Sequence, residues 1–318
     1  MLIVVAVGGN ALLRRGEPLL PATQQRNIRT ACRMLAPLAE RHSLVVTHGN
    51  GPQVGMLALQ DKGHEPFPLD VLGAETEGMI GYLIERELGN LIRPAHELAT
   101  LLTMIEVDPA DPAFRHPTKP IGPTYSKREA ERLVRRLGWT VGRDGDAYRR
   151  VVPSPQPKRI VEIESIRLLL EQGCVVVCAG GGGIPVVLRP DATLEGIAAV
   201  IDKDLTSSLL ARQLEADLLV MATDVDSVYV DWRLPSQRRI VRAHPASLRA
   251  QLFAEGSMAP KIEAACSFVE STAGSAVIGS LDELSEIVEG GSGTTITANA
   301  EGIELATAES EPTPTGAP

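Results

Sequence analysis

The chain has 318 residues, of which 44% are hydrophobic, 22% are charged and only 3% are aromatic. Its formal net charge of −9 argues against nucleic acid and anionic membranes as partners, because both are bound through basic surfaces. With so few aromatic residues, the core must consist of valine, leucine, isoleucine and alanine. That composition suits parallel strands buried between helices.

The cysteines and histidines indicate neither disulfides nor a metal site. The four cysteines lack zinc or Cys-x-x-Cys spacing, and a chain of this size needs no disulfides for stability. No apolar run reaches membrane-spanning length, and the first residues lack the basic segment of a signal peptide. We therefore expect a cytoplasmic protein with no metal-ligating residues of its own and no membrane partner.

The first part of the chain alternates short apolar runs with helical patterns. Strands are predicted over 2–7, 44–47 and 101–107, and helices over 23–41 and 74–87. Strand, glycine turn and helix in repeated succession indicate an α/β fold with a mainly parallel sheet.

A proline-rich stretch interrupts this alternation. Eight prolines between residues 109 and 157 bracket a short basic helix over 127–136 and a hairpin over about 139–152. A structureless loop of this length is improbable inside a compact domain. We therefore expect an inserted subdomain or lid.

The alternation resumes after the insert and continues almost to the end. Helices are predicted over 163–172, 205–215, 264–270 and 281–288, and strands over 175–178, 218–222, 275–278 and 294–296. The residues beyond Asn299 are mostly Glu, Thr, Pro, Ala and Gly, with little to bury, so the tail 299–318 is expected to be disordered.

Three apolar runs end in glycine-rich turns. Their residues are Gly8, Gly9 and Asn10; Gly49, Asn50 and Gly51; and Gly180, Gly181, Gly182 and Gly183. Without Cβ atoms, backbone N–H groups can approach a ligand, and a following helix adds the positive end of its dipole. In an open α/β sheet all three turns lie at the carboxyl edge, so they predict an anion site. None matches the P-loop or the dinucleotide fingerprint.

Lysine is rare in this chain, with six residues against twenty-five arginines. Three of the six, Lys119, Lys203 and Lys261, lie in patterned segments rich in glycine, proline or aspartate. An ammonium group is a compact point charge that can neutralise a phosphoryl oxygen in a tight site. These lysines are therefore candidates for contacts with phosphate.

Seven segments resemble the motifs of the carbamate kinases, in the order of that family. They are Val-Gly-Gly-Asn-Ala-Leu (7–12), Thr-His-Gly-Asn-Gly-Pro-Gln-Val-Gly (47–55), Pro-Thr-Lys-Pro-Ile-Gly-Pro (117–123), Val-Val-Pro-Ser-Pro (151–155), Gly-Gly-Gly-Gly-Ile-Pro-Val (180–186), Val-Ile-Asp-Lys-Asp (200–204) and Gly-Ser-Met-Ala-Pro-Lys (256–261). The first is shared across the wider amino acid kinase family, whereas the segment around Lys119 is more particular to carbamate kinases.

The resemblance implies a three-layer α/β/α sandwich with two lobes and a homodimeric assembly. Residues 1–204 would form the lobe for carbamate or carbamoyl phosphate, with a protruding lid over about 110–157, and residues 205–298 the nucleotide lobe. The implied reaction is ATP with carbamate to ADP and carbamoyl phosphate, with Mg²⁺ accompanying the nucleotide. It is often used in reverse to make ATP after arginine breakdown.

The resemblance also assigns roles to residues. Lys203 and Lys261 would neutralise the transferring phosphoryl group, Asp204 would orient both lysines, and Lys119 would reach from the lid to the carbamate end. The substrate set comprises Gly8, Gly9, Asn10, Gly49, Asn50, Gly51, Gly180, Gly181 and Gly182. The nucleotide set comprises Lys203, Thr223, Asp224, Val225, Met258 and Lys261. No nucleophile is needed, because positioning and charge neutralisation dominate phosphoryl transfer.

Two other functions remain open for the whole chain. One is another amino acid kinase that phosphorylates a carboxylate or a phosphate, which the lid segment around Lys119 disfavours. The other is a non-catalytic binding protein, which would be expected to lack at least one of the charged transfer residues. Among single residues, Asp204 has an alternative role at a helix N-terminus, Asp224 as a turn residue, and His48 as a packing residue.

Overall fold

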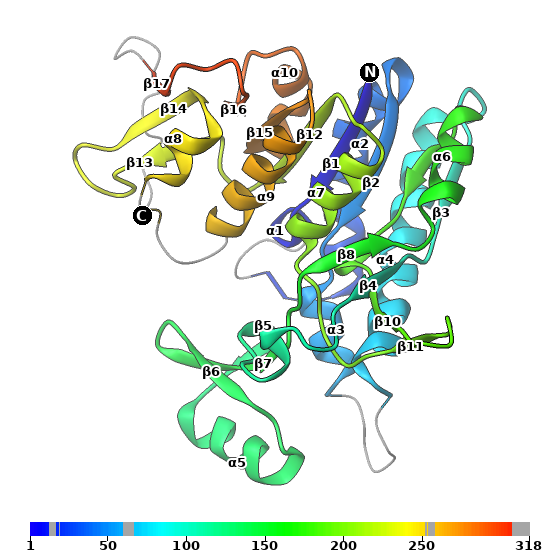
Figure 1. Cartoon of the computed structure of the whole chain (residues 1–318), viewed down its shortest axis with the longest axis vertical. Helices are drawn as coiled ribbons and strands as arrows, with labels where there is room; N and C mark the ends of the chain where they lie inside the picture. Colours follow the sequence, from blue (N-terminus) through cyan, green and yellow to red (C-terminus); the bar gives the residue numbers. More distant parts are fainter. Residues whose placement is uncertain (13–16, 19, 60–66, 252, 254–257, 307–318) are drawn as a thin grey trace.

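One large sheet runs through the body of the molecule (Figure 1). The computed structural model describes residues 1–12, 17–18, 20–59, 67–251, 253 and 258–306, without the side chains of residues 10 and 11. In spatial order the strands are β13 (Val228–Val230), β14 (Arg238–Ala243), β16 (Thr294–Ile296), β15 (Ser275–Ser280), β12 (Leu218–Thr223), β1 (Leu2–Val7), β2 (Ser43–His48), β9 (Val175–Val177) and β3 (Leu98–Thr100). The six strands from β15 to β3 are all parallel, which confirms the mainly parallel sheet.

Helices cover both faces of this sheet because apolar side chains alternate along its strands. In β1, Ile3 and Val5 belong to one buried cluster and Val4 to the other. The first cluster packs under α1 (Gly9–Leu12), α2 (Pro21–Arg41), α4 (Leu69–Ile92) and α10 (Leu284–Val288). The second packs under α6 (Ile163–Glu171), α7 (Lys203–Gln213), α8 (Pro245–Arg249) and α9 (Met258–Ser271). The three-layer α/β/α sandwich is thereby confirmed, and none of the described helices has the length and hydropathy to cross a membrane.

A second sheet corrects one predicted element. Its strands, in spatial order, are β11 (Leu194–Gly196), β10 (Ile184–Leu188), β4 (Met104–Val107) and β8 (Pro157–Ile160). The strand predicted over 101–107 is therefore present only over 104–107, because the chain leaves β3 in the main sheet after Thr100 and enters β4 in the second. Thr103 lies between the two strands, and its hydroxyl accepts a hydrogen bond from Ala179 N at 2.9 Å. Hydrophobic patterning cannot reveal a change of sheet within an apolar run.

The proline-rich stretch contains a small separate unit, the lid, that projects from the body in Figure 1. Its elements are β5 (Lys119–Tyr125), α5 (Lys127–Leu137), β6 (Val141–Asp144) and β7 (Ala147–Val152), with the antiparallel order β5-β7-β6. A capping box between Ser126 and Glu129 begins α5, and Gly138 ends it in the left-handed conformation. The helix and hairpin predicted for this stretch are both present.

The lid touches the body through an unusually close backbone contact. Gly122 of β5 packs on Gly55 of α3 (Gly51–Leu57), where a Cβ on Gly55 would lie 2.0 Å from Gly122 Cα. Around this contact, Val54, Ile121 and Val152 belong to a small buried cluster that joins α3 to β5 and β7 of the lid. Because neither glycine has a side chain, β5 can lie this close to α3.

We expect Gly55→Ala to destabilise the protein by about 1–3 kcal/mol, as overpacking of a tight contact usually does. The new methyl group would overlap the backbone of Gly122, which cannot rotate away. Gly73→Ala is the matched control, because Gly73 lies in α4 with open space around its Cβ position and should gain up to about 1 kcal/mol. Urea denaturation of both variants measures the difference, and equal stabilities would contradict the proposed fit.

The end of the described chain corrects the predicted disorder. β17 (Ile303–Leu305) pairs antiparallel with β14, and Ala306 N donates to Arg239 O at 2.9 Å. Ile303 and Leu305 lie two positions apart, so both face the main core and pack against it. The expectation of disorder is thus wrong for residues 299–306, where two apolar side chains and an available strand edge suffice to order the chain. Residues 307–318 lie outside the described part.

Candidate active site

The three glycine turns lie together at the carboxyl edge of the main sheet. They follow β1, β2 and β9, which are neighbours in the sheet. Gly49 packs on Gly9, because a Cβ on Gly49 would lie 3.0 Å from the Gly9 nitrogen. Gly181 packs on the Asn50 side chain, which in turn donates to Thr76 Oγ1 at 2.8 Å. The structure therefore brings all three predicted turns to one place.

The backbone N–H groups of these turns divide into two sets. Five of them donate within the protein: Gly8 to Ala222 O, Gly49 to Val7 O, Gly180 to Glu77 Oε1, Gly182 to Ala179 O and Gly183 to Gly180 O. The N–H groups of Gly9, Gly51 and Gly181 have no acceptor among the described residues. Each turn thus contributes one glycine N–H that is available to an anion, while the other glycines named above shape the turns.

The third turn is pressed against the start of α7. Gly181 and Gly182 have φ values of 68° and 96°, and a Cβ on Gly182 would lie 2.4 Å from Ile201 O. Thr206 Oγ1, at the end of the first turn of α7, donates to Gly182 O at 2.9 Å. Only glycine tolerates both this backbone and this proximity. The free Gly181 N–H is therefore held close to the first turn of α7.

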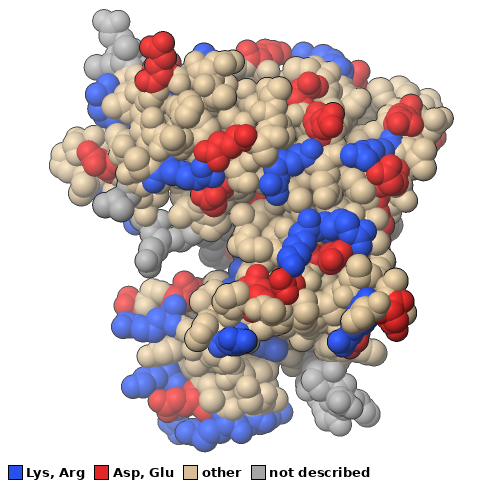
Figure 2. Space-filling view, viewed as in Figure 1, with Lys and Arg blue, Asp and Glu red and all other residues tan. Residues whose placement is uncertain are grey.

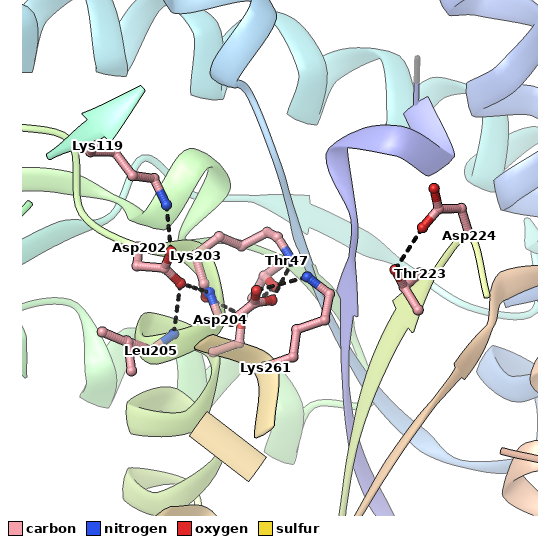
Figure 3. Close-up of polar contacts among 10 residues, drawn as sticks. Thr47, Lys119, Asp202, Lys203, Asp204, Leu205, Thr223, Asp224 and Lys261 are labelled. Atoms are coloured by element: carbon pink, nitrogen blue, oxygen red, sulfur yellow. Dashed lines mark hydrogen bonds and ion pairs between the residues drawn. The ribbon is translucent and has the colours of Figure 1, made fainter. Parts of the chain in front are cut away.

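That first turn joins two buried lysines through one carboxylate (Figure 3). Lys203 Nζ lies 2.6 Å from Asp204 Oδ1, and Lys261 Nζ, from the first turn of α9, lies 2.9 Å from Asp204 Oδ2. The three side chains are only 7–12% exposed. Burial alone would raise the pKa of Asp204, but the two ammonium groups hold that pKa well below its usual range. Burial lowers the pKa of Lys203, and Asp204 opposes this shift.

The lid supplies a third lysine to the same turn of α7. Lys119, the first residue of β5, forms an ion pair with Asp202 Oδ2. Asp202 is the N-cap of α7, and its other oxygen accepts from Asp204 N at 2.9 Å. All four residues predicted to be catalytic thus lie on or beside Asp202–Asp204, although they come from the lid, α7 and α9.

Comparison with known proteins identifies the family of this chain. The model of the amino acid kinase family matches residues 1–280. The chain is 55% identical over 306 residues to the carbamate kinase of Haemophilus influenzae, covering 95% of this chain and 99% of that protein. The chain belongs to the carbamate kinases of the amino acid kinase family. It is therefore a phosphotransferase with a carboxyl group as acceptor.

Two further carbamate kinases bear on the substrate and fold. That of Rhizobium meliloti is 51% identical over 304 residues, covering 94% of each chain. A solved structure of the carbamate kinase from Giardia lamblia bound to AMP-PNP matches with a TM-score of 0.84 and 36% identity, over 93% of this chain and 98% of that one. The same arrangement of layers therefore holds an ATP analogue in that relative.

Of the residues predicted for the nucleotide, Thr223 and Asp224 lie further along the sheet edge, at and after the end of β12. Figure 3 shows Thr223 and Asp224 beyond the end of β1 from the lysines, with the Thr223 hydroxyl 3.1 Å from Asp224 Oδ1. Met258 begins α9 three residues before Lys261, and Val225 is half-buried. The side chain of Asn10 lies outside the described part, as do Gly256 and Ser257 of the α9 motif.

Two buried residues lie behind the third turn: Glu77, which sequence reasoning missed, and His48, which it gave a packing role. Glu77 of α4 accepts from Gly180 N at 2.8 Å and from Thr103 N at 3.3 Å, and His48 lies against Gly180. Burial raises the pKa of Glu77 to about 8 although both N–H groups oppose the shift, and burial lowers the pKa of His48 to about 4. The signal for Glu77 was a carboxylate among the mostly apolar buried residues of α4.

We expect Glu77→Gln to change how stability depends on pH. The folded pKa of about 8 exceeds the ordinary glutamate value of 4.5, so between these pH values the folded state holds a proton that the unfolded chain has released. Stability of the natural protein should therefore fall by roughly 1 kcal/mol per pH unit from this group as pH rises through that window. Glutamine does not titrate, so the difference in unfolding free energy between variant and natural protein should increase with pH. Urea denaturation at pH 5, 6, 7 and 8 measures it, and a constant difference would contradict the assignment.

Proposed function

We propose that this protein catalyses reversible phosphoryl transfer between ATP and carbamate, giving ADP and carbamoyl phosphate. The observation that carries the proposal is the meeting of three unpaired glycine N–H groups with the lysine–aspartate group of α7 and α9. Such donors fit a phosphoryl group whose charge spreads over several oxygens. The carbamate kinases of Haemophilus influenzae and Rhizobium meliloti support carbamate as the acceptor.

The proposed mechanism needs no nucleophilic side chain. Carbamate is already an oxyanion, so the protein has to align it with the γ-phosphoryl group and neutralise the charge in between. Lys203 and Lys261 neutralise the transferring group and the β-phosphate, while Asp204 holds the two ammonium groups beside each other and orients them. The N–H groups of Gly9 and Gly181 bind phosphoryl oxygens, and Lys119 serves the carbamate end.

We propose that Mg²⁺ arrives with the nucleotide rather than on a protein site. Both oxygens of Asp204 are paired with lysines, and among the described residues no group of three or more Asp, Glu, His or Cys side chains gathers as metal ligands. These residues fit an ion held mainly by nucleotide phosphates and water. When bound, the ion supplies further charge neutralisation on the phosphates.

The division of labour between the lobes is part of the same proposal. Residues 1–204, with the lid over about 110–157, bind carbamate or carbamoyl phosphate, and residues 205–298 bind the nucleotide. Thr223, Asp224, Val225 and Met258 border the nucleotide. In Figure 3 the lysines lie between Lys119 and the pair Thr223 and Asp224, and this position of the pair supports the same order of ligand groups along the sheet edge.

We further propose a cytoplasmic homodimer that makes ATP from carbamoyl phosphate supplied by arginine breakdown. Met79, Tyr82 and Leu102 are exposed large apolar residues, and Leu102 reaches towards Gly78 from beside β3. These exposed apolar residues on α4 and just after β3 support a contact between two copies. Light scattering on the full chain should give twice the mass of 33.9 kDa, and a Tyr82→Glu variant should shift it towards one copy.

The decisive experiment is ATP formation from ADP, Mg²⁺ and carbamoyl phosphate, with acetyl phosphate at the same concentration as the control substrate. Selective turnover of carbamoyl phosphate would support the proposal. Faster turnover of acetyl phosphate would point to a different acyl phosphate on the same fold. A folded protein without turnover on either substrate would contradict a catalytic role.

A further inference from the structure

The two oxygens of Asp202 perform separate tasks. Oδ1 caps α7 by accepting from Asp204 N at 2.9 Å and from Leu205 N at 3.4 Å, whereas Oδ2 binds the ammonium group of Lys119. The carboxylate is therefore fixed by the helix before any ligand binds. It offers the lid lysine a rigid partner rather than a mobile surface charge.

Asp202 also stands in a row of alternating charges. Lys119, Asp202, Lys203, Asp204 and Lys261 follow one another across the first turn of α7, as Figure 3 shows. Asp204 joins the lysines of α7 and α9, and Asp202 makes the corresponding contact for the lysine of the lid. In addition, the backbone of Asp202 packs beside Gly182 of the third glycine turn. The Lys119 ammonium is thus held near the third glycine turn.

The lid alone does not place that ammonium group. The contact between Gly122 and Gly55 fixes the backbone of β5 three residues away from Lys119. The lysine side chain beyond it has four rotatable bonds and is 30% exposed, so without a partner it would sample many rotamers. The contact with Asp202 selects one of them.

We propose that Asp202 is a positioning residue that holds Lys119 in the orientation needed to contact the carbamate end of carbamoyl phosphate. An ammonium group has three N–H donors, so Lys119 can keep its bond to Asp202 and still donate to a substrate oxygen. The inference rests on the proposed function, because it assigns the task of Asp202 through that of Lys119. It predicts that loss of the Asp202 charge lowers kcat/KM for carbamoyl phosphate and leaves KM for ADP nearly unchanged.

Asp202→Asn separates the two tasks of the residue. Asparagine is as good an N-cap as aspartate, so α7 should keep its first turn while the ion pair with Lys119 is lost. We expect kcat/KM for carbamoyl phosphate to fall about 10–100-fold, the scale of a misplaced substrate contact, with KM for ADP and the melting temperature nearly unchanged. Asp108→Asn is the matched control, since it breaks the Asp108–Lys158 ion pair on the exposed surface, 2.7 Å in length, and should leave kinetics unchanged.

A double-mutant cycle with Lys119→Ala distinguishes positioning from a structural effect. If Asp202 acts through Lys119, adding Asp202→Asn to Lys119→Ala should cost almost nothing further. The proposal would be overturned if Asp202→Asn lowered kcat/KM equally in the natural and the Lys119→Ala proteins. It would also be overturned if Asp202→Asn alone left kcat/KM for carbamoyl phosphate unchanged or raised it. These failures require an active natural enzyme, so they are distinguishable from failure of the proposed function, in which the natural protein itself gives no turnover.

Discussion

Lys203→Ala is expected to lower kcat for ATP formation by about 10²–10³-fold, the loss typical when one preorganised donor to a transition state is removed. The Lys203 ammonium lies 2.6 Å from Asp204 Oδ1 and is almost buried, so it is fixed before the substrates bind. Water that replaces it would have to reorganise during the reaction. Lys261 would then face the developing charge alone. Alanine is an excellent helix residue, so the start of α7 should survive.

Steady-state kinetics with carbamoyl phosphate and ADP measure this effect. Lys158→Ala is the matched control, because it also removes a lysine from an ion pair but does so on the exposed surface. Surface pairs contribute little, and we expect kcat within about twofold of the natural protein. A Lys203→Ala enzyme as active as this control would remove Lys203 from the transfer step.

The positions of the glycine turns could be predicted because they follow from sheet geometry. Each turn comes directly after an apolar run, and parallel strands end at the same edge of a sheet. What each glycine does there could not be predicted. Gly180 and Gly9 look alike in the sequence, yet Gly180 N donates to Glu77 while Gly9 N has no acceptor among the described residues. That difference depends on α4, about a hundred residues away along the chain.

The charged residues could likewise be predicted from sequence motifs, but one of their contacts could not, because it depends on tertiary packing. Lys203 and Asp204 were found together because they are adjacent in a motif, and Lys261 because its own segment resembles the family. The contact between Lys119 and Asp202 spans 83 residues and depends on how near the lid lies to the body. Gly55 and Gly122 set that distance by lacking side chains. No local pattern records such a fit.

The limits of periodicity explain the errors in the predicted elements. Residues 101–107 are apolar enough for one strand, but the chain changes sheets at Thr103, where hydrogen bonds rather than hydrophobicity set its path. The tail beyond Asn299 is polar overall, yet Ile303 and Leu305 complete the edge of the main sheet. In both places long-range backbone pairing outweighs local composition.

Asp204→Asn is expected to reduce the free energy of unfolding by about 3–5 kcal/mol, because removal of one partner leaves buried charge uncompensated. Asparagine is nearly the same size, so the loss reports charge rather than a cavity. Lys203 and Lys261 are about 12% and 8% exposed and would confront each other without a counterion. Turnover should also collapse, because the lysines would separate.

The pH dependence and a second substitution test this explanation of Asp204. Burial already lowers the pKa of Lys203, and loss of the carboxylate should lower that pKa further. The unfolded chain would then bind more protons than the folded one at neutral pH, so the stability of Asp204→Asn should recover as pH rises towards the unfolded lysine value. Adding Lys203→Met should restore stability without restoring turnover. Urea denaturation at pH 7 and 9.5 measures both effects; a pH-independent loss that Lys203→Met does not relieve would mean that Asp204 stabilises the helix rather than the pair of lysines.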